Sequence, residues 1–356
     1  MAAIAAATAG LLLVSGLGRT AEAPSLVPPA QSPALSILTY NVHGLPWPLA
    51  SGRPAAFGAI AQRLQSLRAL GAQPHIVVLQ EAFTPAAKRI GVEAGYRYIA
   101  FGPSARTAGN PAHTAADRRF EAGGSWFRGE GLGKFTDSGL VLLSDYPIVK
   151  VSRAAFPDYA CAGFDCLANK GVLLASVKVP GIAHPVAVAT THLVSRFATG
   201  VADARNFYAY RREVDMLAGF LRANADPESA IVLAGDFNVG IAPGRRAALL
   251  GEVASAWRGE GYAPVADALR TCLSKGPECP GASESDAAFS LHRGRDWQLF
   301  AAAPGYRLAV TGIRILFGHA PDGEMLSDHV GYEADYALAS APARRAGPAA
   351  RPATNG

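Results

Sequence analysis

Polar residues suited to phosphate ester chemistry stand at the ends of short apolar runs in this sequence. Asn41, Glu81 and Asp236 each follow such a run, and Asp328-His329 immediately precedes another. Strand ends of an α/β scaffold provide a rigid base on which a polar site is built in this way. Oxygen ligands beside a histidine suit a hard divalent cation with an acid–base group, which cleavage of a phosphate ester needs. These residues therefore predict an enzyme.

A cation site is predicted at the first two of these strand ends. Glu81 follows four consecutive apolar residues, and its carboxylate together with the amide of Asn41 offers oxygen ligands for a hard cation. We expect Mg²⁺, with Mn²⁺ and Co²⁺ as alternatives. Asn41 by itself also fits a turn residue that ends the strand before Gly44.

An acid and an amide follow the third run. Only one residue separates Asp236 from Asn238, so in an extended segment the two side chains face the same side. Such a pair can hold a nucleophilic water and a phosphoryl oxygen together. The structural alternative is an Asp/Asn turn after a strand.

Two histidines are candidates for proton transfer and phosphate contact. His192 ends an apolar run and is placed to donate to a phosphate oxygen, although a hydrogen-bonded structural role is the alternative. His329 needs a carboxylate other than Asp328 to orient it, because adjacent side chains diverge on a strand. Asp296 is the best candidate, and an Asp–His pair makes a general base for water. Asp328 is then available to the metal side of the site.

The segments that must position these residues alternate between strand and helix patterns. Apolar stripes of helical period predict helices at 55–70, 206–224 and 245–256. Apolar runs, several of them continuous as in strands covered on both faces, predict strands at 35–40, 76–79, 140–143, 172–179, 186–191, 231–234, 297–301 and 330–337. Two packed sheets with helices outside satisfy this order. The segments 102–134 and 263–295 are expected to be long polar loops that form a binding surface.

Together these marks resemble the endonuclease/exonuclease/phosphatase superfamily, the fold of DNase I and of the neutral sphingomyelinases. The matching motifs occur in the family's order and spread across 35–339: Leu38-Thr39-Tyr40-Asn41, Leu79-Gln80-Glu81, Thr191-His192-Leu193, Gly235-Asp236-Phe237-Asn238, Arg295-Asp296-Trp297 and Ser327-Asp328-His329. The resemblance implies a four-layered α/β sandwich of two mixed β-sheets flanked by helices.

The same resemblance implies roles for individual residues. Mg²⁺ is held chiefly by Glu81 and Asn41. Asp236 and Asn238 lie around the water and the phosphate, and His192 contacts the phosphate. His329 is the base, oriented by Asp296.

Within the superfamily, the sequence looks closest to the neutral sphingomyelinase and phospholipase C branch. Asn169-Lys170-Gly171 is similar to the Asn-Lys-Gly loop of sphingomyelinase-type phosphodiesterases. A lysine beside a glycine turn can place a cation and backbone N–H groups at a phosphate, so Asn169 and Lys170 are predicted to bind phosphate. An ordinary surface turn is the alternative. His43 stands where nuclease members often present an acid.

One feature departs from that branch. Secreted bacterial sphingomyelinases carry an exposed aromatic hairpin before the last motifs, whereas the stretch 281–293 contains Phe289 as its single aromatic residue. Trp126 and Phe127 are alternative candidates for contact with a membrane, and local packing of this aromatic pair is the other interpretation.

The composition and the cysteine spacing limit the classes of protein to which the chain can belong. Half of the 356 residues are hydrophobic and 17% are charged, which excludes disorder for most of the chain. The net charge of +5 favours phosphate-rich partners such as nucleic acid or an anionic membrane surface. The close pairs Cys161/Cys166 and Cys272/Cys279 predict two local disulfides in an exported chain, with zinc binding as the alternative.

The ends of the chain have compositions of their own. Residues 1–23 are similar to an export signal, with an apolar run and a small-x-small cleavage pattern. A Pro/Ala/Ser linker is predicted over 24–34, one catalytic domain over 35–339, and a disordered tail over 340–356. We therefore expect a secreted or periplasmic protein, and a monomer.

The sequence as a whole predicts a secreted Mg²⁺-dependent phosphodiesterase that hydrolyses a phospholipid such as sphingomyelin. The membrane surface would be its partner. An extracellular DNase I-like endonuclease acting on nucleic acid is one alternative. A noncatalytic phosphate-binding protein is the other.

Overall fold

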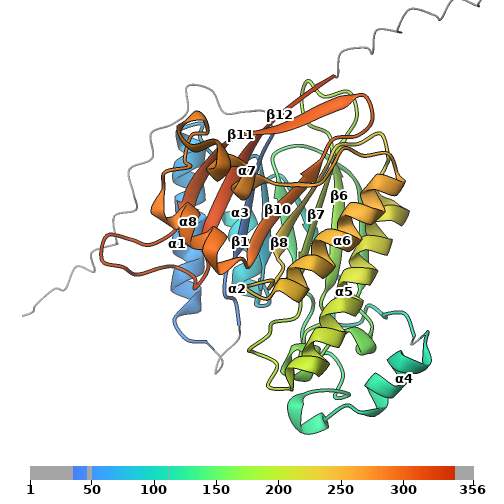
Figure 1. Cartoon of the computed structure of the whole chain (residues 1–356). Helices are drawn as coiled ribbons and strands as arrows, with labels where there is room; N and C mark the ends of the chain where they lie inside the picture. Colours follow the sequence, from blue (N-terminus) through green and yellow to red (C-terminus); the bar gives the residue numbers. More distant parts are fainter. Residues whose placement is uncertain (1–34, 46–49, 112, 341–356) are drawn as a thin grey trace, which may run out of the picture.

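A computed structural model describes residues 35–45, 50–111 and 113–340 (Figure 1). The predicted signal segment, the predicted linker and residues 341–356 of the predicted tail lie outside the described residues.

Two six-stranded sheets form the centre of the molecule (Figure 1). The first sheet has the strand order β11 (Tyr306–Phe317), β12 (Gly331–Ser340), β1 (Leu35–Asn41), β2 (Ile76–Gln80), β4 (Val141–Ser144) and β3 (Tyr98–Phe101). The second has the order β5 (Ile148–Ala155), β6 (Gly171–Val177), β7 (Val186–His192), β8 (Ile231–Asp236), β10 (Asp296–Ala301) and β9 (Ala266–Asp267). Both sheets are mixed, because β1 runs parallel to β2 and β7 runs parallel to β8 while the other neighbours are antiparallel.

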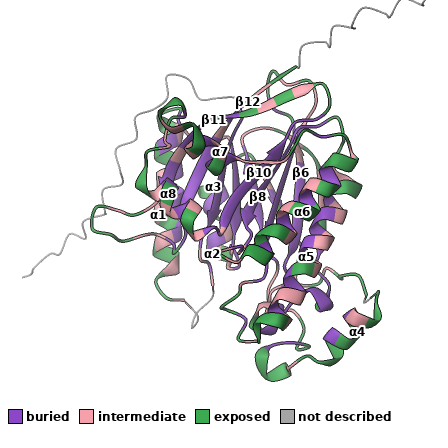
Figure 2. Ribbon diagram, in the orientation of Figure 1, coloured by how far each residue is buried: buried purple, intermediate pink, exposed green. Residues whose placement is uncertain are grey.

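Helices cover the outer face of each sheet, so the fold has the four layers that were predicted. The helices α1 (Arg53–Ala69), α2 (Pro85–Lys88) and α3 (Ile90–Glu93) share a core with β1 and β2. On the other side, α5 (Asp203–Asn224) and α6 (Pro243–Gly259) pack on β7 and β8. A third apolar core lies between the sheets and extends to α7 (Ala268–Lys275) and α8 (Ser285–Arg293). Figure 2 shows that these layers bury the inner strands β1, β8 and β10, drawn in purple, while the far end of β12 is intermediate or exposed.

The direction of the strands explains why polar residues from distant motifs meet. The parallel pairs β1/β2 and β7/β8 end at Asn41, Gln80, His192 and Asp236. β10 and β12 run antiparallel to their neighbours β8 and β1, so each begins at the edge where its neighbour ends. Asp296 at the start of β10 and His329 just before β12 therefore arrive at the same edge of the sandwich.

Two of the predicted long loops contain helices. The segment 102–134 includes α4 (Ala115–Ala122) and a 3₁₀ turn at Trp126–Arg128, and the segment 263–295 includes β9, α7 and α8. The stretch compared with the aromatic hairpin of sphingomyelinases is thus mainly the helix α8. These helices have eight or nine residues each, so a helical period has only about two turns in which to appear.

Both predicted disulfides are present, as Cys161–Cys166 and Cys272–Cys279. The paired cysteines are five and seven positions apart in the sequence. None of the helices in the described part of the chain is long and apolar enough to cross a bilayer.

A buried acid fastens α4 to α5. Asp117 completes a capping box with Thr114, accepts a hydrogen bond from Tyr208 at 2.7 Å, and forms an ion pair with Arg212 at 2.9 Å. Burial alone would raise the pKa of Asp117, but hydrogen bonds from Tyr208 and Thr114 and the charge of Arg212 outweigh it and lower the pKa to about 2.

Asp117→Asn should make folding less sensitive to acid. Because the folded pKa lies below the unfolded value of about 3.9, the ionised carboxylate stabilises the fold above about pH 4, and this contribution is lost as the pH falls through about 2. We expect the variant to lose about 1–3 kcal/mol at neutral pH, and the difference from wild type to shrink between pH 4 and 2. Urea unfolding at several pH values measures this, and a difference that stays constant would contradict it.

Candidate active site

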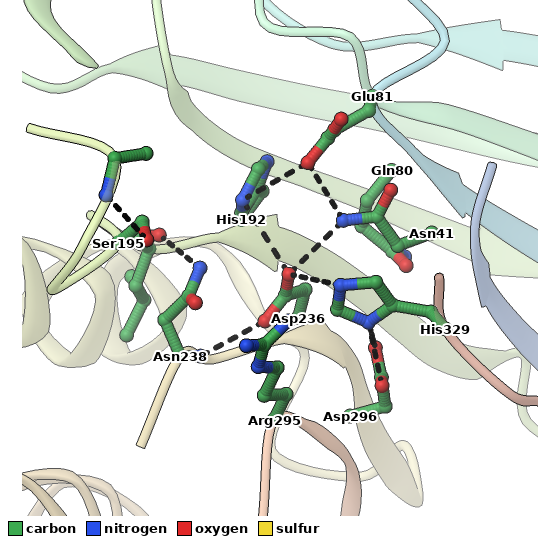
Figure 3. A network of polar contacts seen from close by, with 12 residues as sticks. Asn41, Gln80, Glu81, His192, Ser195, Asp236, Asn238, Arg295, Asp296 and His329 are labelled. Carbon is green, nitrogen blue, oxygen red and sulfur yellow. Dashed lines mark hydrogen bonds and ion pairs between the residues drawn. The ribbon is translucent and has the colours of Figure 1, made fainter. Parts of the chain in front are cut away.

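Six of the predicted residues meet around one carboxylate oxygen (Figure 3). Asn41 Nδ2 donates to Glu81 Oε1 at 2.9 Å and to Asp236 Oδ2 at 3.0 Å. The Nε2 atoms of His192 and His329 lie 3.5 and 3.7 Å from the same Asp236 oxygen. Asp296 completes the set behind His329. All six lie at or next to the ends of strands. Each sheet contributes three of them, when Glu81 is counted with β2, which it follows, and His329 with β12, which it precedes.

Strand register sets part of this geometry. His192, Asp236 and Asp296 stand opposite one another on the neighbouring strands β7, β8 and β10. Gly235 precedes Asp236 where β8 approaches β7 closely, and a Cβ there would overlap the carbonyl oxygen of Thr191. A side chain at this position would therefore separate the strands that hold His192 and Asp236 together.

Three residues at the site have a strained, left-handed backbone conformation. His43, Glu81 and Asn238 are the three non-glycine residues with positive φ in the described ranges, at 49°, 56° and 47°. Each follows a site strand by one or two residues. Residues other than glycine adopt this conformation at a cost, and such strain concentrates at functional sites. Gly44 adds to the constraint, because a Cβ there would overlap the carbonyl oxygen of Glu81.

His329 has the environment of a general base. Its Nδ1 lies 2.8 and 3.0 Å from the two carboxylate oxygens of Asp296, which fixes Nδ1 as the protonated nitrogen and points Nε2 toward Asp236. Burial lowers the pKa of His329, but the carboxylates of Asp296 and Asp236 outweigh burial and raise the pKa to about 10. A cation on Asp236 would offset the charge of that carboxylate and lower the pKa of His329 toward the range in which it acts as a base at neutral pH. The contact with Asp296 is the one that the sequence predicted.

His192 is held neutral beside Lys170. The Lys170 Nζ lies 3.3 Å from His192 Nε2, donates to the carbonyl of Leu193 at 3.2 Å, and forms an ion pair with Asp165 at 2.7 Å. Burial, then the charges of Lys170 and His329, keep the pKa of His192 well below its usual value. A neutral imidazole can donate a hydrogen bond to a phosphoryl oxygen without adding charge, and Lys170 supplies a cation immediately next to it.

The donor set fits a hard cation. Glu81, His192 and Asp236 each offer a ligand atom, all within 4.8 Å of one another, and a second such group is formed by Asp236, Asp296 and His329. Glu81 Oε2 is buried without a hydrogen-bond partner, so it has a lone pair directed at no protein donor. The oxygen of Asn41 accepts the backbone N–H of His43 at 2.9 Å, while its nitrogen faces Glu81 and Asp236. In this arrangement the Asn41 amide nitrogen holds the two carboxylates, and the predicted role of Asn41 as a metal ligand stays a prediction.

Asp328 lies at the rim. Its carboxylate is 3.1 Å from His43 Nδ1 and 3.7 Å from an Arg295 nitrogen, and its side chain is half exposed. Burial would raise the pKa of Asp328, but the hydrogen bond from His43 and the nearby positive charges outweigh it and lower the pKa. The same hydrogen bond is the main reason that the pKa of His43 is raised. Asp328 belongs to neither group of clustered ligand atoms, and its predicted metal role stays a prediction.

Asn238 and Asn169 act on neighbouring backbone in this structure. β8 ends at Asp236, so Asn238 stands in a left-handed turn and not in the extended segment that was assumed; its N–H donates to Asp236 Oδ1 and its Nδ2 to the carbonyl of Leu193, both at 3.0 Å. The Asn169 amide is buried on the carbonyls of Ser104 and Thr107. Phosphate binding by Asn169 is therefore not visible here and stays a prediction.

Two residues outside the motifs, Glu213 on α5 and Arg245 on α6, hold the loops of the site in place. Arg245 is buried and donates to the carbonyls of Val194 and Asn238 at 2.8 and 2.7 Å, which joins the loops that follow His192 and Asp236. Glu213 accepts the N–H of Val194 at 2.6 Å. Polar residues inside an amphipathic helix look like solvent-facing residues in a sequence, so periodicity could not have found them.

Comparisons with known proteins identify the family of the chain and agree with its fold. The model of the Endonuclease/Exonuclease/phosphatase family matches residues 38–356. None of the curated proteins matches the sequence.

Among solved structures, a beta toxin double mutant from Staphylococcus aureus with bound magnesium ions has a TM-score of 0.55 at 18% identity, covering 85% of this chain and 99% of that chain. Sphingomyelinase C from Streptomyces griseocarneus has a TM-score of 0.53 at 22% identity, covering 84% and 98%. An endonuclease/exonuclease/phosphatase protein from Beutenbergia cavernae has a TM-score of 0.52 at 22% identity, covering 87% and 72%. These likenesses show the fold. With the family model spanning nearly all of the described residues, the chain belongs to the endonuclease/exonuclease/phosphatase family.

Proposed function

We propose that the protein is a secreted, Mg²⁺-dependent phosphodiesterase that hydrolyses a phospholipid such as sphingomyelin and releases its phosphorylated headgroup. The observation that supports this most directly is the pairing of an oriented base, His329 on Asp296, with a buried carboxylate cluster 3.7 Å away. Membership of a family of phosphodiester hydrolases supports the reaction class.

The residues divide the reaction between them. His329 Nε2 accepts a proton from the attacking water while the water oxygen bonds to phosphorus. The P–O bond to the lipid breaks with its electron pair on the lipid oxygen, which takes a proton from solvent water and leaves as the alcohol. Asp296 stabilises the imidazolium that forms. His192 donates to a phosphoryl oxygen, and Lys170 places positive charge where negative charge develops.

A cation would complete this site. Glu81 and Asp236 would hold it, with Asn41 orienting both carboxylates. When bound, Mg²⁺ supplies Lewis-acid stabilisation of negative charge on the phosphate. The magnesium ions of the related beta toxin support this choice of metal.

One observation favours a lipid over nucleic acid: exposed aromatic side chains border the site, as developed below. The two disulfides support secretion, since such bonds persist in oxidising compartments.

Headgroup release from sphingomyelin should exceed degradation of plasmid DNA by the same preparation. We expect Mg²⁺-dependent release of phosphocholine from sphingomyelin vesicles, and little nicking of plasmid at equal enzyme concentration. Release across several phospholipids then ranks the headgroups. The Glu81→Gln variant controls for contaminating hydrolases. Rapid DNA cleavage without lipid hydrolysis would reject the lipid proposal in favour of a nuclease. If none of the diesters is hydrolysed, the result would favour a noncatalytic phosphate-binding protein.

A further inference from the structure

Five exposed aromatic residues lie on three neighbouring segments, and we call this set the aromatic collar: Trp126, Phe127, Phe135, Phe164 and Phe197. In the described part of the chain, the other exposed aromatic side chains are Tyr98 and Phe101, and both lie on the edge strand β3. Phe197, Phe127 and Phe135 are 80%, 74% and 73% exposed. Exposed apolar residues are ordinary when scattered, but a contiguous group marks an interaction surface.

Backbone contacts tie the three segments of the collar together. Phe135 N–H donates to the carbonyl of Leu167 at 2.8 Å, and Phe164 N–H donates to the carbonyl of Thr199 at 3.1 Å. The Arg128 guanidinium reaches the carbonyl of Gly200. The segments 126–135, 163–168 and 197–200 therefore occupy neighbouring positions at the end of the molecule where α5 begins, beside the lobe that carries α4 (Figures 1 and 2).

The collar is continuous with the active site. Asp165, next to Phe164, forms the ion pair with Lys170 and accepts the N–H of Ser195 at 3.3 Å. Lys170 in turn lies 3.3 Å from His192 Nε2. One acid thus links the collar segment 163–168 and the loop after β7 to the residues proposed to hold phosphate.

The side chains of the collar combine apolar rings with basic groups. Trp126 and Phe127 stack with ring centroids 3.7 Å apart. The Arg196 guanidinium lies 5.5 Å from the ring centroid of Phe197 but pairs with Asp203 at 2.6 Å, so the net positive charge of the collar comes from Arg128, whose guanidinium binds a neutral carbonyl. Aromatic rings with cationic neighbours suit the boundary between acyl chains and phosphate headgroups, where rings enter the apolar layer and basic groups meet phosphates.

We propose that the aromatic collar docks the protein on a phospholipid bilayer and so presents lipid headgroups to the adjacent catalytic site. This inference rests on the proposed function for the chemistry of the adjacent site, while the exposed apolar rings identify lipid as the occupant. Docking concentrates the enzyme at the substrate surface, while hydrolysis itself is carried out by the residues at the strand ends.

Binding to vesicles tests the collar separately from catalysis. Phe127→Ser and Phe197→Ser, singly and combined, are placed in the Glu81→Gln background so that lipid is not consumed. Co-sedimentation with vesicles of sphingomyelin and phosphatidylcholine should fall by about tenfold for each single variant and by more than about fiftyfold for the double variant, since each removes a large apolar contact.

Matched controls exclude a general effect of removing surface apolar groups. Leu70→Ser and Val149→Ser alter side chains that are 60% and 55% exposed outside the collar, and their vesicle binding should stay within about twofold of the parent. With Glu81 restored, hydrolysis of a short-chain monomeric sphingomyelin should be unchanged by the collar variants, whereas hydrolysis of vesicles falls.

The possible outcomes are distinct. Vesicle binding that is unaltered in the folded double variant, or absent in the parent, would overturn the collar proposal even if lipid is hydrolysed. Self-association that the same variants abolish, without vesicle binding, would show that a second copy covers the surface and would also overturn it. Collar-dependent vesicle binding by a protein that hydrolyses no lipid would support docking and reject the proposed function.

Discussion

His329→Ala is expected to lower kcat on a sphingomyelin substrate by about 10²- to 10⁴-fold, the usual contribution of a positioned general base. The imidazole is oriented by both oxygens of Asp296 and directs Nε2 toward the carboxylate cluster, so no neighbouring group can take over the proton. The loss should appear in kcat more than in KM, because the base acts on water. Steady-state hydrolysis of the monomeric short-chain substrate measures this without vesicle binding.

A second His–Asp pair provides the control. His319 Nδ1 lies 2.6 Å from Asp286 at the exposed surface, so His319→Ala removes the same kind of contact and should leave kcat unchanged. Near-normal turnover by folded His329→Ala would remove the proposed role of this residue.

The pH profile separates a base from a structural histidine. Because His329 must be unprotonated to act, the rate rises with pH through its pKa, which the Asp296 carboxylate raises. Asp296→Asn should therefore reduce the maximum rate and move the rising limb to lower pH. A merely structural pair would lower the rate without moving that limb.

The predictable part of the fold was its centre. All eight strands expected from apolar runs occur in the structure, within a few residues of the expected bounds. The four strands that were not predicted, β3, β5, β9 and β11, are the edge strands of the two sheets. Edge strands are partly exposed and mixed in composition, as β5 illustrates, since all of its residues except the last are exposed or half-buried. A strand that is buried on both faces needs apolar residues at consecutive positions, so it appears in the sequence as a continuous apolar run. An edge strand is partly exposed and does not need such a run.

The site divides in a similar way. Residues at strand ends were predictable because strand polarity and order bring Asn41, Glu81, Asp236 and His329 to one edge. Two other features of the site could not be predicted from the sequence. The left-handed backbone at Glu81 is not encoded by a glycine, and the hold of Arg245 on two loops depends on how α6 packs. The collar was predicted only at Trp126 and Phe127, since its other members are distant in sequence.

Glu81→Gln is expected to lower Mg²⁺-supported kcat/KM by about 10³-fold, because Lewis-acid stabilisation of several kcal/mol corresponds to about one decade per 1.36 kcal/mol. The substitution preserves size and the hydrogen bond from Asn41 at Oε1, but removes the charge that would attract the cation. EDTA should silence wild type and added Mg²⁺ should restore it. Glu252→Gln, an exposed change on α6, is the control and should behave as wild type. Activity that persists in thoroughly chelated buffer would refute the metal requirement.

Thermal unfolding of the same variant distinguishes loss of the cation from loss of the fold. Mg²⁺ at 100 times its Kd should stabilise wild type by about 2.7 kcal/mol, and the variant should lose most of this gain. Without Mg²⁺, Glu81→Gln should unfold no more easily than wild type. The reason is that the Glu81 carboxylate has one buried oxygen without a partner and lies near the Asp236 carboxylate, so without a cation its charge is a cost to the fold. A variant that is destabilised equally with and without Mg²⁺ would show instead that Glu81 holds β2 in place and does not bind the metal.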